Sequence, residues 1–215
     1  MTRPKVDGLY AITPDIADTA SLVSMTRQVL AGGARLIQYR NKTANAVLRL
    51  EQARLLASLC REFYVPLIVN DHLDLAVEVN ADGVHVGQGD ASIAEARRKL
   101  GDGKIVGASC YNRLEHAFEA ERQGADYVAF GAFYVSSTKP GAVRASMDLL
   151  RRAKATLCVP VVAIGGITAR AAGELIQEGA VAVAVSSALF EVQNIQSAAE
   201  SFAGLFNRNC NSITH

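Results

Sequence analysis

A hydroxyl-rich segment follows an apolar stretch in the second half of the chain. The stretch YVAFGA (residues 127–132) has the composition of a buried strand, and after it come Ser136, Ser137, Thr138 and Lys139, ahead of a Pro-Gly pair. Backbone N–H groups, hydroxyl donors and an ammonium group that converge on one point suit a phosphate or a diphosphate better than a neutral ligand. A polar turn that ends in a surface lysine is the alternative.

The segment LIQYRNK (residues 36–42) places an amide and two cations at alternate positions. Side chains alternate along a strand, so Gln38, Arg40 and Lys42 share one face. Tyr39 lies on the other face, which we expect to meet the helices. Two cations and an amide on an inner face need an anion to compensate them. That anion is either a bound diphosphate or a carboxylate on a neighbouring strand.

Two aspartates follow the next two apolar stretches. Asp71 ends the third stretch, and Asp90 comes shortly after the fourth. Neighbouring strands lie about 4.7–4.9 Å apart, so carboxylates just past two adjacent strand ends can reach one cation. Mg²⁺ takes oxygen ligands, commonly one or two carboxylates together with waters and substrate phosphates. The alternative is that each aspartate caps the helix that follows it. The nearby Arg40 and Lys42 favour the metal–diphosphate interpretation.

Glycines and hydroxyl groups end the later stretches. Ser109 closes the fifth, Gly165 and Gly166 close the seventh, and Ser186 closes the eighth. In a barrel of alternating strands and helices, glycine-rich backbone after strands seven and eight commonly forms a phosphate pocket. The pattern predicts a second phosphate site, suited to a monophosphate. An enzyme that joins a diphosphate donor to a phosphorylated acceptor would need both sites.

Eight short apolar stretches, separated by segments with helical periodicity, must position these residues. The stretches are residues 8–13, 36–40, 66–71, 83–87, 105–110, 127–132, 160–166 and 181–186. Each is nearly continuous in apolar residues, which is typical of parallel strands buried on both faces. The alternation predicts one α/β domain over residues 1–215, a single (β/α)8 TIM barrel with its site at the carboxyl ends of the strands. A doubly wound open sheet is the competitor, but none of the stretches is charged enough to be an edge strand.

Helix signals support this alternation. Ser92 and Glu95 form a capping box. Thr168 is placed to cap the helix after the seventh stretch. Residues 197–206 read as the last helix, and a short polar tail follows at about 207–215.

Composition excludes several classes of partner. The 215 residues carry a net charge of +1, which gives no electrostatic case for nucleic acid or an anionic membrane. No apolar run is long enough to span a bilayer, and the first residues lack the apolar region of a secretory signal. The four cysteines are scattered without a C-x-x-C pair. We therefore expect a cytoplasmic protein with reduced thiols.

The histidines add no catalytic set. No two of them have metal-ligand spacing. His85 falls within the fourth apolar stretch, where a core histidine with satisfied hydrogen bonds is expected. His72 directly follows Asp71, and the sequence assigns it no role.

Seven motifs occur in order along the chain: QYRNK, VNDH, DGVHVGQGD, GASC, SSTKPGA, VAIGGI and AVSSA. With them the chain resembles the thiamine-phosphate synthase family, from residue 8 to the final helix. The resemblance implies a (β/α)8 barrel and a transferase of thiamine biosynthesis that requires one Mg²⁺ per subunit. Its small-molecule substrates would be 4-amino-2-methyl-5-hydroxymethylpyrimidine diphosphate and 4-methyl-5-(2-phosphoethyl)thiazole. Thiamine phosphate and pyrophosphate would be released.

The resemblance also assigns residues to each substrate. Those around the pyrimidine diphosphate would be Gln38, Tyr39, Arg40, Asn41, Lys42, Asn70, Ser109 and Lys139. Those around the thiazole phosphate would be Ser136, Ser137, Thr138, Gly166, Val185 and Ser186. Asp71 and Asp90 would hold Mg²⁺. The catalytic residues would be Arg40, Lys42 and Lys139, which stabilise negative charge on the departing diphosphate.

One departure from the family falls in the hydroxyl-rich segment. The chain has Val135-Ser136-Ser137-Thr138-Lys139 where the family more often has Pro-Thr-x-Thr-Lys. Serine keeps the hydroxyl donor and loses only a methyl group, so we expect phosphate binding to survive.

Three alternatives remain. A thiazole isomerase-like paralogue would lack much of the diphosphate machinery, which this chain retains. A non-catalytic binder of thiamine-pathway phosphates would bind both ligands without turnover. A class I aldolase would use Lys139 to form a Schiff base.

Overall fold

Eight parallel strands close into a barrel in which neighbours along the chain are neighbours in space. The computed structural model describes residues 5–135 and 144–210, with side chains to residue 207. The strands are β1 (Gly8–Ile12), β2 (Leu36–Tyr39), β3 (Leu67–Asn70), β4 (Gly83–Val86), β5 (Ile105–Tyr111), β6 (Tyr127–Phe130), β7 (Val161–Ile164) and β8 (Ala182–Val185). β1 pairs with β8 to complete the ring. The predicted TIM barrel and all eight predicted strands are confirmed, and the open sheet is wrong.

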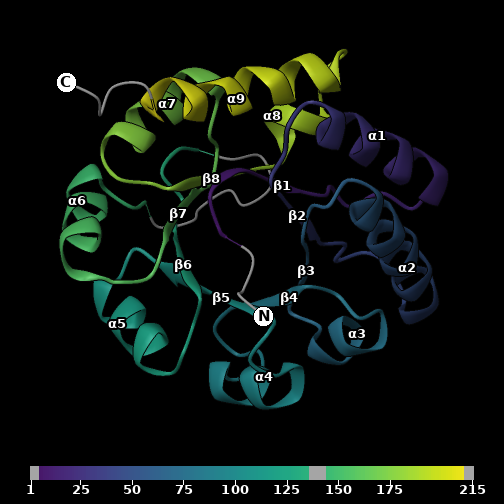
Figure 1. Cartoon of the computed structure of the whole chain (residues 1–215), viewed down its shortest axis with the longest axis horizontal. Helices are drawn as coiled ribbons and strands as arrows, with labels where there is room; N and C mark the ends of the chain where they lie inside the picture. The colour runs from purple at the N-terminus through teal and green to yellow at the C-terminus, as the bar shows by residue number, and fades with distance from the viewer. Residues whose placement is uncertain (1–4, 136–143, 211–215) are drawn as a thin grey trace.

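The helices surround the strands (Figure 1). They are α1 (Thr19–Ala31), α2 (Ala46–Glu62), α3 (Leu73–Glu78), α4 (Ile93–Leu100), α5 (Leu114–Arg122), α6 (Met147–Thr156), α7 (Ala169–Gln177), α8 (Ser187–Phe190) and α9 (Ile195–Cys210). Two predicted caps are confirmed: Ser92 Oγ accepts from the Glu95 N–H, and Thr168 Oγ1 accepts from the Ala171 N–H. Within the described part of the chain, no helix is both long and apolar enough to span a membrane.

The last helix is longer than predicted at both ends. Asn194 Oδ1 accepts from the Ser197 N–H at 2.9 Å, so the helix is capped before Ser197 rather than beginning there. At its other end the helix continues through residues 207–210, which contain neither glycine nor proline to stop it. The predicted polar tail is therefore partly helical, and residues 211–215 lie outside the described residues.

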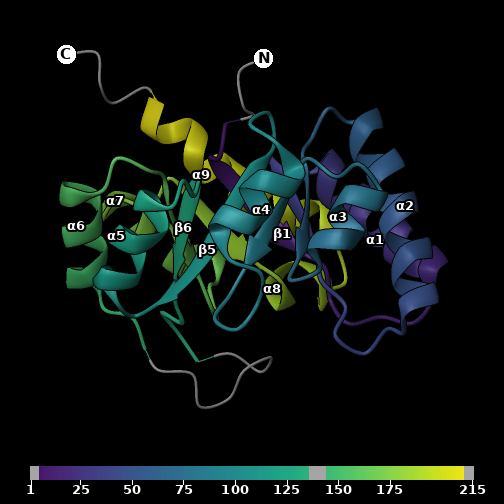
Figure 2. The same cartoon turned by 90° about the horizontal axis from the view of Figure 1, so that it is seen from below.

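The barrel contains two separate apolar layers. The inner one fills the interior, and the outer one lies between the strands and the helices. Tyr10 and Tyr127 are the largest side chains of the inner layer, and both are fully buried. A side-on view shows the helices surrounding the strands and the short α8 at the end of the barrel where the strands have their carboxyl termini (Figure 2). That end carries the candidate site.

Candidate active site

The two faces of β2 separate as the alternation predicts. Gln38 is 3% exposed and donates from Nε2 to the hydroxyl of Tyr10 inside the barrel, at 2.8 Å. Tyr39 belongs to the outer layer, and its hydroxyl donates to Gln52 Oε1 of α2 at 2.9 Å. The side chain of Tyr39 therefore points away from the barrel mouth. Only its main chain remains available for the predicted contact with a substrate.

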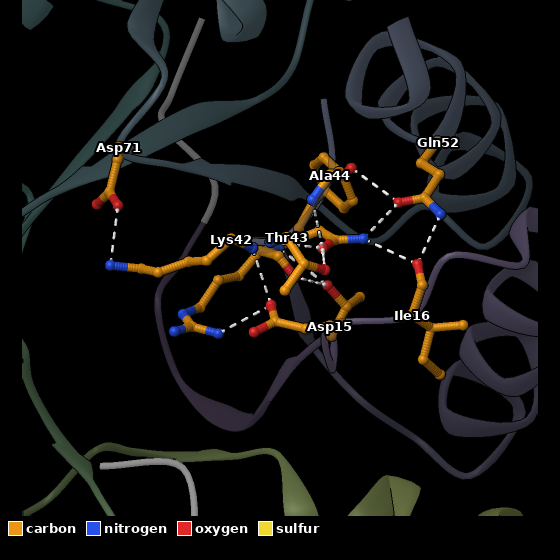
Figure 3. A network of polar contacts seen from close by, with 11 residues as sticks. Asp15, Ile16, Lys42, Thr43, Ala44, Gln52 and Asp71 are labelled. Atoms are coloured by element: carbon orange, nitrogen blue, oxygen red, sulfur yellow. Dashed lines mark hydrogen bonds and ion pairs between the residues drawn. The ribbon is translucent and has the colours of Figure 1, made fainter. Parts of the chain in front are cut away.

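Each cation near the end of β2 faces a carboxylate (Figure 3). Arg40 Nη1 lies 3.1 Å from Asp15 Oδ1, and Lys42 Nζ lies 3.6 Å from Asp71 Oδ2. Asp15 follows β1, the neighbouring strand, and its Oδ1 also accepts from the Lys42 backbone N–H at 2.9 Å. The ion pairs that were the alternative to a bound diphosphate are therefore present in the structure. A guanidinium has five N–H donors, so the bond to Asp15 leaves Arg40 others for a phosphate.

Sequence reasoning missed Asp15. Its position in the sequence could have revealed it. Asp15 lies three residues after the end of β1, and acidic residues just past two other strand ends were already candidates for the site. One carboxylate oxygen orients both the Arg40 side chain and the Lys42 backbone. Asp15 therefore ties the Arg40 side chain to the backbone of the loop that carries Lys42.

Asn41 holds the loop between β2 and α2 together. Its side chain is buried, and Oδ1 accepts from the backbone N–H groups of Thr43 and Ala44. Its Nδ2 donates to the Ile16 carbonyl at 2.8 Å and to Gln52 Oε1 at 3.1 Å (Figure 3). These bonds occupy the amide within the protein. The Asn41 side chain therefore does not point into the mouth of the barrel. By holding the loop it positions its two sequence neighbours, Arg40 and Lys42.

Asp71 and Asp90 meet at the ends of β3 and β4. Burial raises the pKa of Asp71, and the neighbouring Asp90 carboxylate raises it further, against an opposing effect of Lys42. The Asp90 side chain is held by the Gly87 backbone N–H, which donates to Oδ2 at 2.7 Å. Neither aspartate caps the next helix, because α3 begins after His72 and α4 is capped by Ser92. The capping alternative is wrong.

This pair suits a hard divalent cation. A cation between the two side chains would relieve the repulsion that the Asp90 carboxylate exerts on Asp71. Mg²⁺ needs only one or two protein carboxylates, since waters and substrate phosphates complete its shell. The described residues contain no group of three or more His, Cys, Asp or Glu side chains that would hold a metal without a substrate. The residues fit a cation shared with a diphosphate.

Two further predicted residues lie at the same rim. Ser109 of β5 is half-buried, and its Oγ lies 2.8 Å from His85 Nε2. His85 is 6% exposed and its Nδ1 lies 2.9 Å from the Tyr127 hydroxyl, so it is the satisfied core histidine that was expected. Asn70 ends β3, pairs in register with His85, and is half-buried.

The glycines and the serine predicted to bind the second phosphate follow β7 and β8, which are adjacent strands. Gly165 and Gly166 both have positive φ, and a Cβ at Gly166 would overlap the backbone of Tyr134 and Val135. Glycine is required there because the chain after β6 packs directly against it. Ser186 follows β8 and is half-buried.

The hydroxyl-rich segment itself lies outside the described residues. This applies to the predicted Ser136, Ser137, Thr138 and Lys139. The residues just before this segment lie next to the end of β7, where the Tyr134 N–H donates to the Gly165 carbonyl at 3.0 Å. Val185 is buried in the outer layer, so only its main chain can serve a ligand in the mouth.

Known proteins resemble this chain over nearly its whole length. Residues 9–189 match the family model for thiamine monophosphate synthase. A thiamine-phosphate synthase from Nitrosospira multiformis is 61% identical over 206 residues, covering 96% of this chain and 88% of that protein. One from Nitrosomonas eutropha is 58% identical and covers 96% and 97%. The solved thiamine phosphate pyrophosphorylase from Pyrococcus furiosus has a TM-score of 0.84 at 34% identity, covering 94% of this chain and 96% of that one. The chain belongs to the thiamine monophosphate synthase family.

Proposed function

We propose that this chain is a transferase that couples 4-amino-2-methyl-5-hydroxymethylpyrimidine diphosphate to 4-methyl-5-(2-phosphoethyl)thiazole. The products are thiamine phosphate and pyrophosphate. The observation that carries the proposal is the rim geometry: Lys42 faces Asp71, Asp90 adjoins it, and Arg40 lies two residues before Lys42. In a chain 61% identical to a thiamine-phosphate synthase, this set is a site for a metal-bound diphosphate.

The leaving group is stabilised by the chain's own cations. Arg40 and Lys42 face the departing diphosphate, and Asp15 keeps Arg40 oriented toward the mouth. Lys139 is assigned the same role by family resemblance, and it lies outside the described residues. Asp71 and Asp90 would hold one Mg²⁺ per subunit, which would supply Lewis-acid stabilisation of the charge on the diphosphate.

The substitution proceeds by departure before attack. The aminopyrimidine shares positive charge with its methylene carbon, so the C–O bond to the diphosphate can break first. The thiazole nitrogen then forms the C–N bond with its own electron pair, and no protein nucleophile or general base is required. Gln38 and Ser109 are the inward-facing polar groups proposed to hold the pyrimidine.

The acceptor is held on the opposite side of the mouth. Backbone N–H groups around Gly166, Val185 and Ser186, together with Ser136, Ser137 and Thr138, are proposed to bind the thiazole phosphate. The positive φ of Gly166 supports this, because closely approaching glycine backbone makes concave sites for anions.

A direct assay tests the function. The purified protein is mixed with both substrates, with Mg²⁺ or with EDTA, and thiamine phosphate and pyrophosphate are quantified. We expect equal amounts of both products with Mg²⁺ and none with EDTA. Binding of both substrates without turnover would replace the proposal with a phosphate binder, and trapping of a carbonyl substrate by borohydride would indicate the aldolase.

We also place the protein in the cytoplasm. Cys60, Cys110 and Cys158 are free thiols in the described part of the chain, and Cys158 is exposed. Unpaired cysteines are typical of reducing compartments. Separating cell fractions and measuring the activity in each would test the placement.

A further inference from the structure

A continuous row of hydrogen bonds crosses the barrel interior beneath the candidate site. It runs from Gln38 Nε2 to the Tyr10 hydroxyl at 2.8 Å, and from there to the Tyr127 hydroxyl at 2.8 Å. The Tyr127 hydroxyl lies 2.9 Å from His85 Nδ1, and His85 Nε2 lies 2.8 Å from Ser109 Oγ. We name these five residues the inner chain. Its two ends, Gln38 and Ser109, are both proposed to contact the pyrimidine substrate.

Five strands contribute one residue each, so barrel closure is what joins them. The five are β1, β2, β4, β5 and β6, which line one interior (Figure 1). The Tyr127 ring stacks on His85 and meets Tyr10 edge-on, with ring centroids 5.5 Å and 5.9 Å apart. Gly107 of β5 makes room for this ring, because a Cβ there would overlap it. The inner chain is therefore packed into one geometry.

The orientation of the Gln38 amide, together with the number of protons, sets the direction of every bond in the row. Gln38 uses its amide N–H on Tyr10, so the single proton of Tyr10 is donated to Tyr127. Tyr127 in turn donates to His85 Nδ1, which must then be unprotonated. The proton of a neutral imidazole lies on Nε2 and is donated to Ser109 Oγ. Ser109 accepts this bond and keeps its own proton to donate to a ligand.

If His85 were charged, the row would contain one more proton than it has acceptors. If both ring nitrogens of His85 donated, Tyr127 would have to turn its proton to Tyr10, which already accepts from Gln38. The proton of Tyr10 would then have no acceptor within the inner chain. Burial also raises the pKa of both tyrosines above the ordinary value, so both hydroxyls keep their protons at neutral pH.

We propose that the inner chain is a positioning device that holds His85 as its Nε2–H tautomer, and so presents Gln38 Oε1 as an acceptor and the Ser109 hydroxyl as a donor to the substrate. The fixed acceptor selects a pyrimidine that carries an amino group over one that carries an oxo group at the same position. Tyr10, Tyr127 and His85 act through the two end residues and need not touch the substrate. The identity of the ligand rests on the proposed function, whereas the tautomer does not.

The tautomer is measured directly on the ligand-free protein. Nitrogen-15 NMR of the labelled histidine side chains, at mildly alkaline pH, distinguishes a protonated from an unprotonated ring nitrogen at each site. The signals of His85 are identified by their loss in His85→Gln. We expect a protonated Nε2 and an unprotonated Nδ1. A protonated Nδ1 would mean that the bonds run from Ser109 to Gln38, and it would overturn the proposal.

Removing the Tyr127 hydroxyl tests whether the inner chain controls the state of His85. Tyr127→Phe keeps the ring but removes the hydroxyl that donates to His85 Nδ1, so the nitrogen-15 signal of Nδ1 should move toward that of an unprotonated nitrogen that accepts no hydrogen bond, while Nε2 stays protonated. Tyr39→Phe is the matched control, since it removes a buried tyrosine hydroxyl bonded to Gln52 outside the inner chain. It should leave the His85 signals unchanged. An unchanged Nδ1 signal in folded Tyr127→Phe would also overturn the proposal.

Kinetics then separate positioning from mere packing. For Tyr127→Phe we expect the KM of the pyrimidine diphosphate to rise about two- to tenfold, the effect of one misplaced hydrogen bond. The KM of the thiazole phosphate should stay unchanged, and discrimination against the oxo analogue should fall by a similar factor. Equal changes for both substrates would make the inner chain a packing feature only. If wild-type protein gave no turnover, the proposed function would fail while the NMR result still stood.

Discussion

Lys42 and Asp71 face each other across the strand ends of β2 and β3, with Nζ 3.6 Å from Oδ2. Lys42 is about half exposed and Asp71 about one quarter exposed, so the pair is open to the mouth. A weak, wet ion pair of this kind contributes little to stability. It fits a site in which an arriving metal and diphosphate separate the two charges, the metal to the aspartate and the diphosphate to the lysine.

Replacing Asp71 with asparagine should impair the use of the metal. Asp71→Asn keeps the size of the side chain but removes its negative charge, so that Asp90 is the one carboxylate left of the pair. We expect kcat/KM to fall about a hundredfold or more, with a higher Mg²⁺ concentration for half-maximal rate. The matched control is Asp74→Asn, an exposed carboxylate of α3 paired with Lys99. Rates of Asp71→Asn near those of the control, at every Mg²⁺ concentration, would remove the metal role.

Asp71 should also make stability depend on pH and Mg²⁺. Its pKa is raised in the folded protein by burial and by Asp90. A carboxyl with a raised folded-state pKa stabilises the fold at acidic pH and loses that contribution as the pH rises through the raised value. Mg²⁺ binds only the charged form, so it should raise Tm more at neutral than at acidic pH. Melting curves across pH, with and without Mg²⁺, check this, and Asp71→Asn should flatten both effects. A Tm insensitive to Mg²⁺ at neutral pH would contradict the prediction.

Asp15 should matter for the diphosphate although it does not touch it. Asp15→Asn keeps an oxygen for the Lys42 N–H but loses the charge that orients Arg40. We expect the KM of the pyrimidine diphosphate to rise about tenfold, as for a lost hydrogen bond to a charged group. Steady-state kinetics with each substrate varied in turn provides the measurement. A comparable rise in the KM of the thiazole phosphate would show that the change is not local to Arg40.

Gln52 should stabilise the loop that carries Arg40 and Lys42. It is fully buried, donates to the Ile16 carbonyl, and accepts from Tyr39 and Asn41. Gln52→Ala leaves these groups unsatisfied, so the free energy of unfolding should fall by about 2–3 kcal/mol. Urea unfolding measures it. The control is Gln28→Ala on the exposed side of α1, where little change is expected. Equal stabilities of the two variants would mean that water replaces the amide.

Particular residues show how far sequence reasoning reached into the site. The alternation of β2 correctly placed Gln38 inside the barrel and Tyr39 against α2, because the two faces of a strand follow from a period of two residues. The same reasoning did not reveal that the Asn41 side chain donates hydrogen bonds to Ile16 and Gln52. Its partners come from a loop and a helix whose positions relative to β2 depend on packing.

The sequence by itself determined the eight strands, their parallel pairing and the polar residues at their carboxyl ends. These features depend on local apolar composition and on alternation, which can be read along the chain. Only the tertiary structure decided that Asp15 meets Arg40 and that Gln38 is joined to Ser109 through three buried side chains. Such contacts join residues 25 to 117 positions apart. They exist because the barrel closes, and the direction of a side chain inside it is set by the packing of all the strands together.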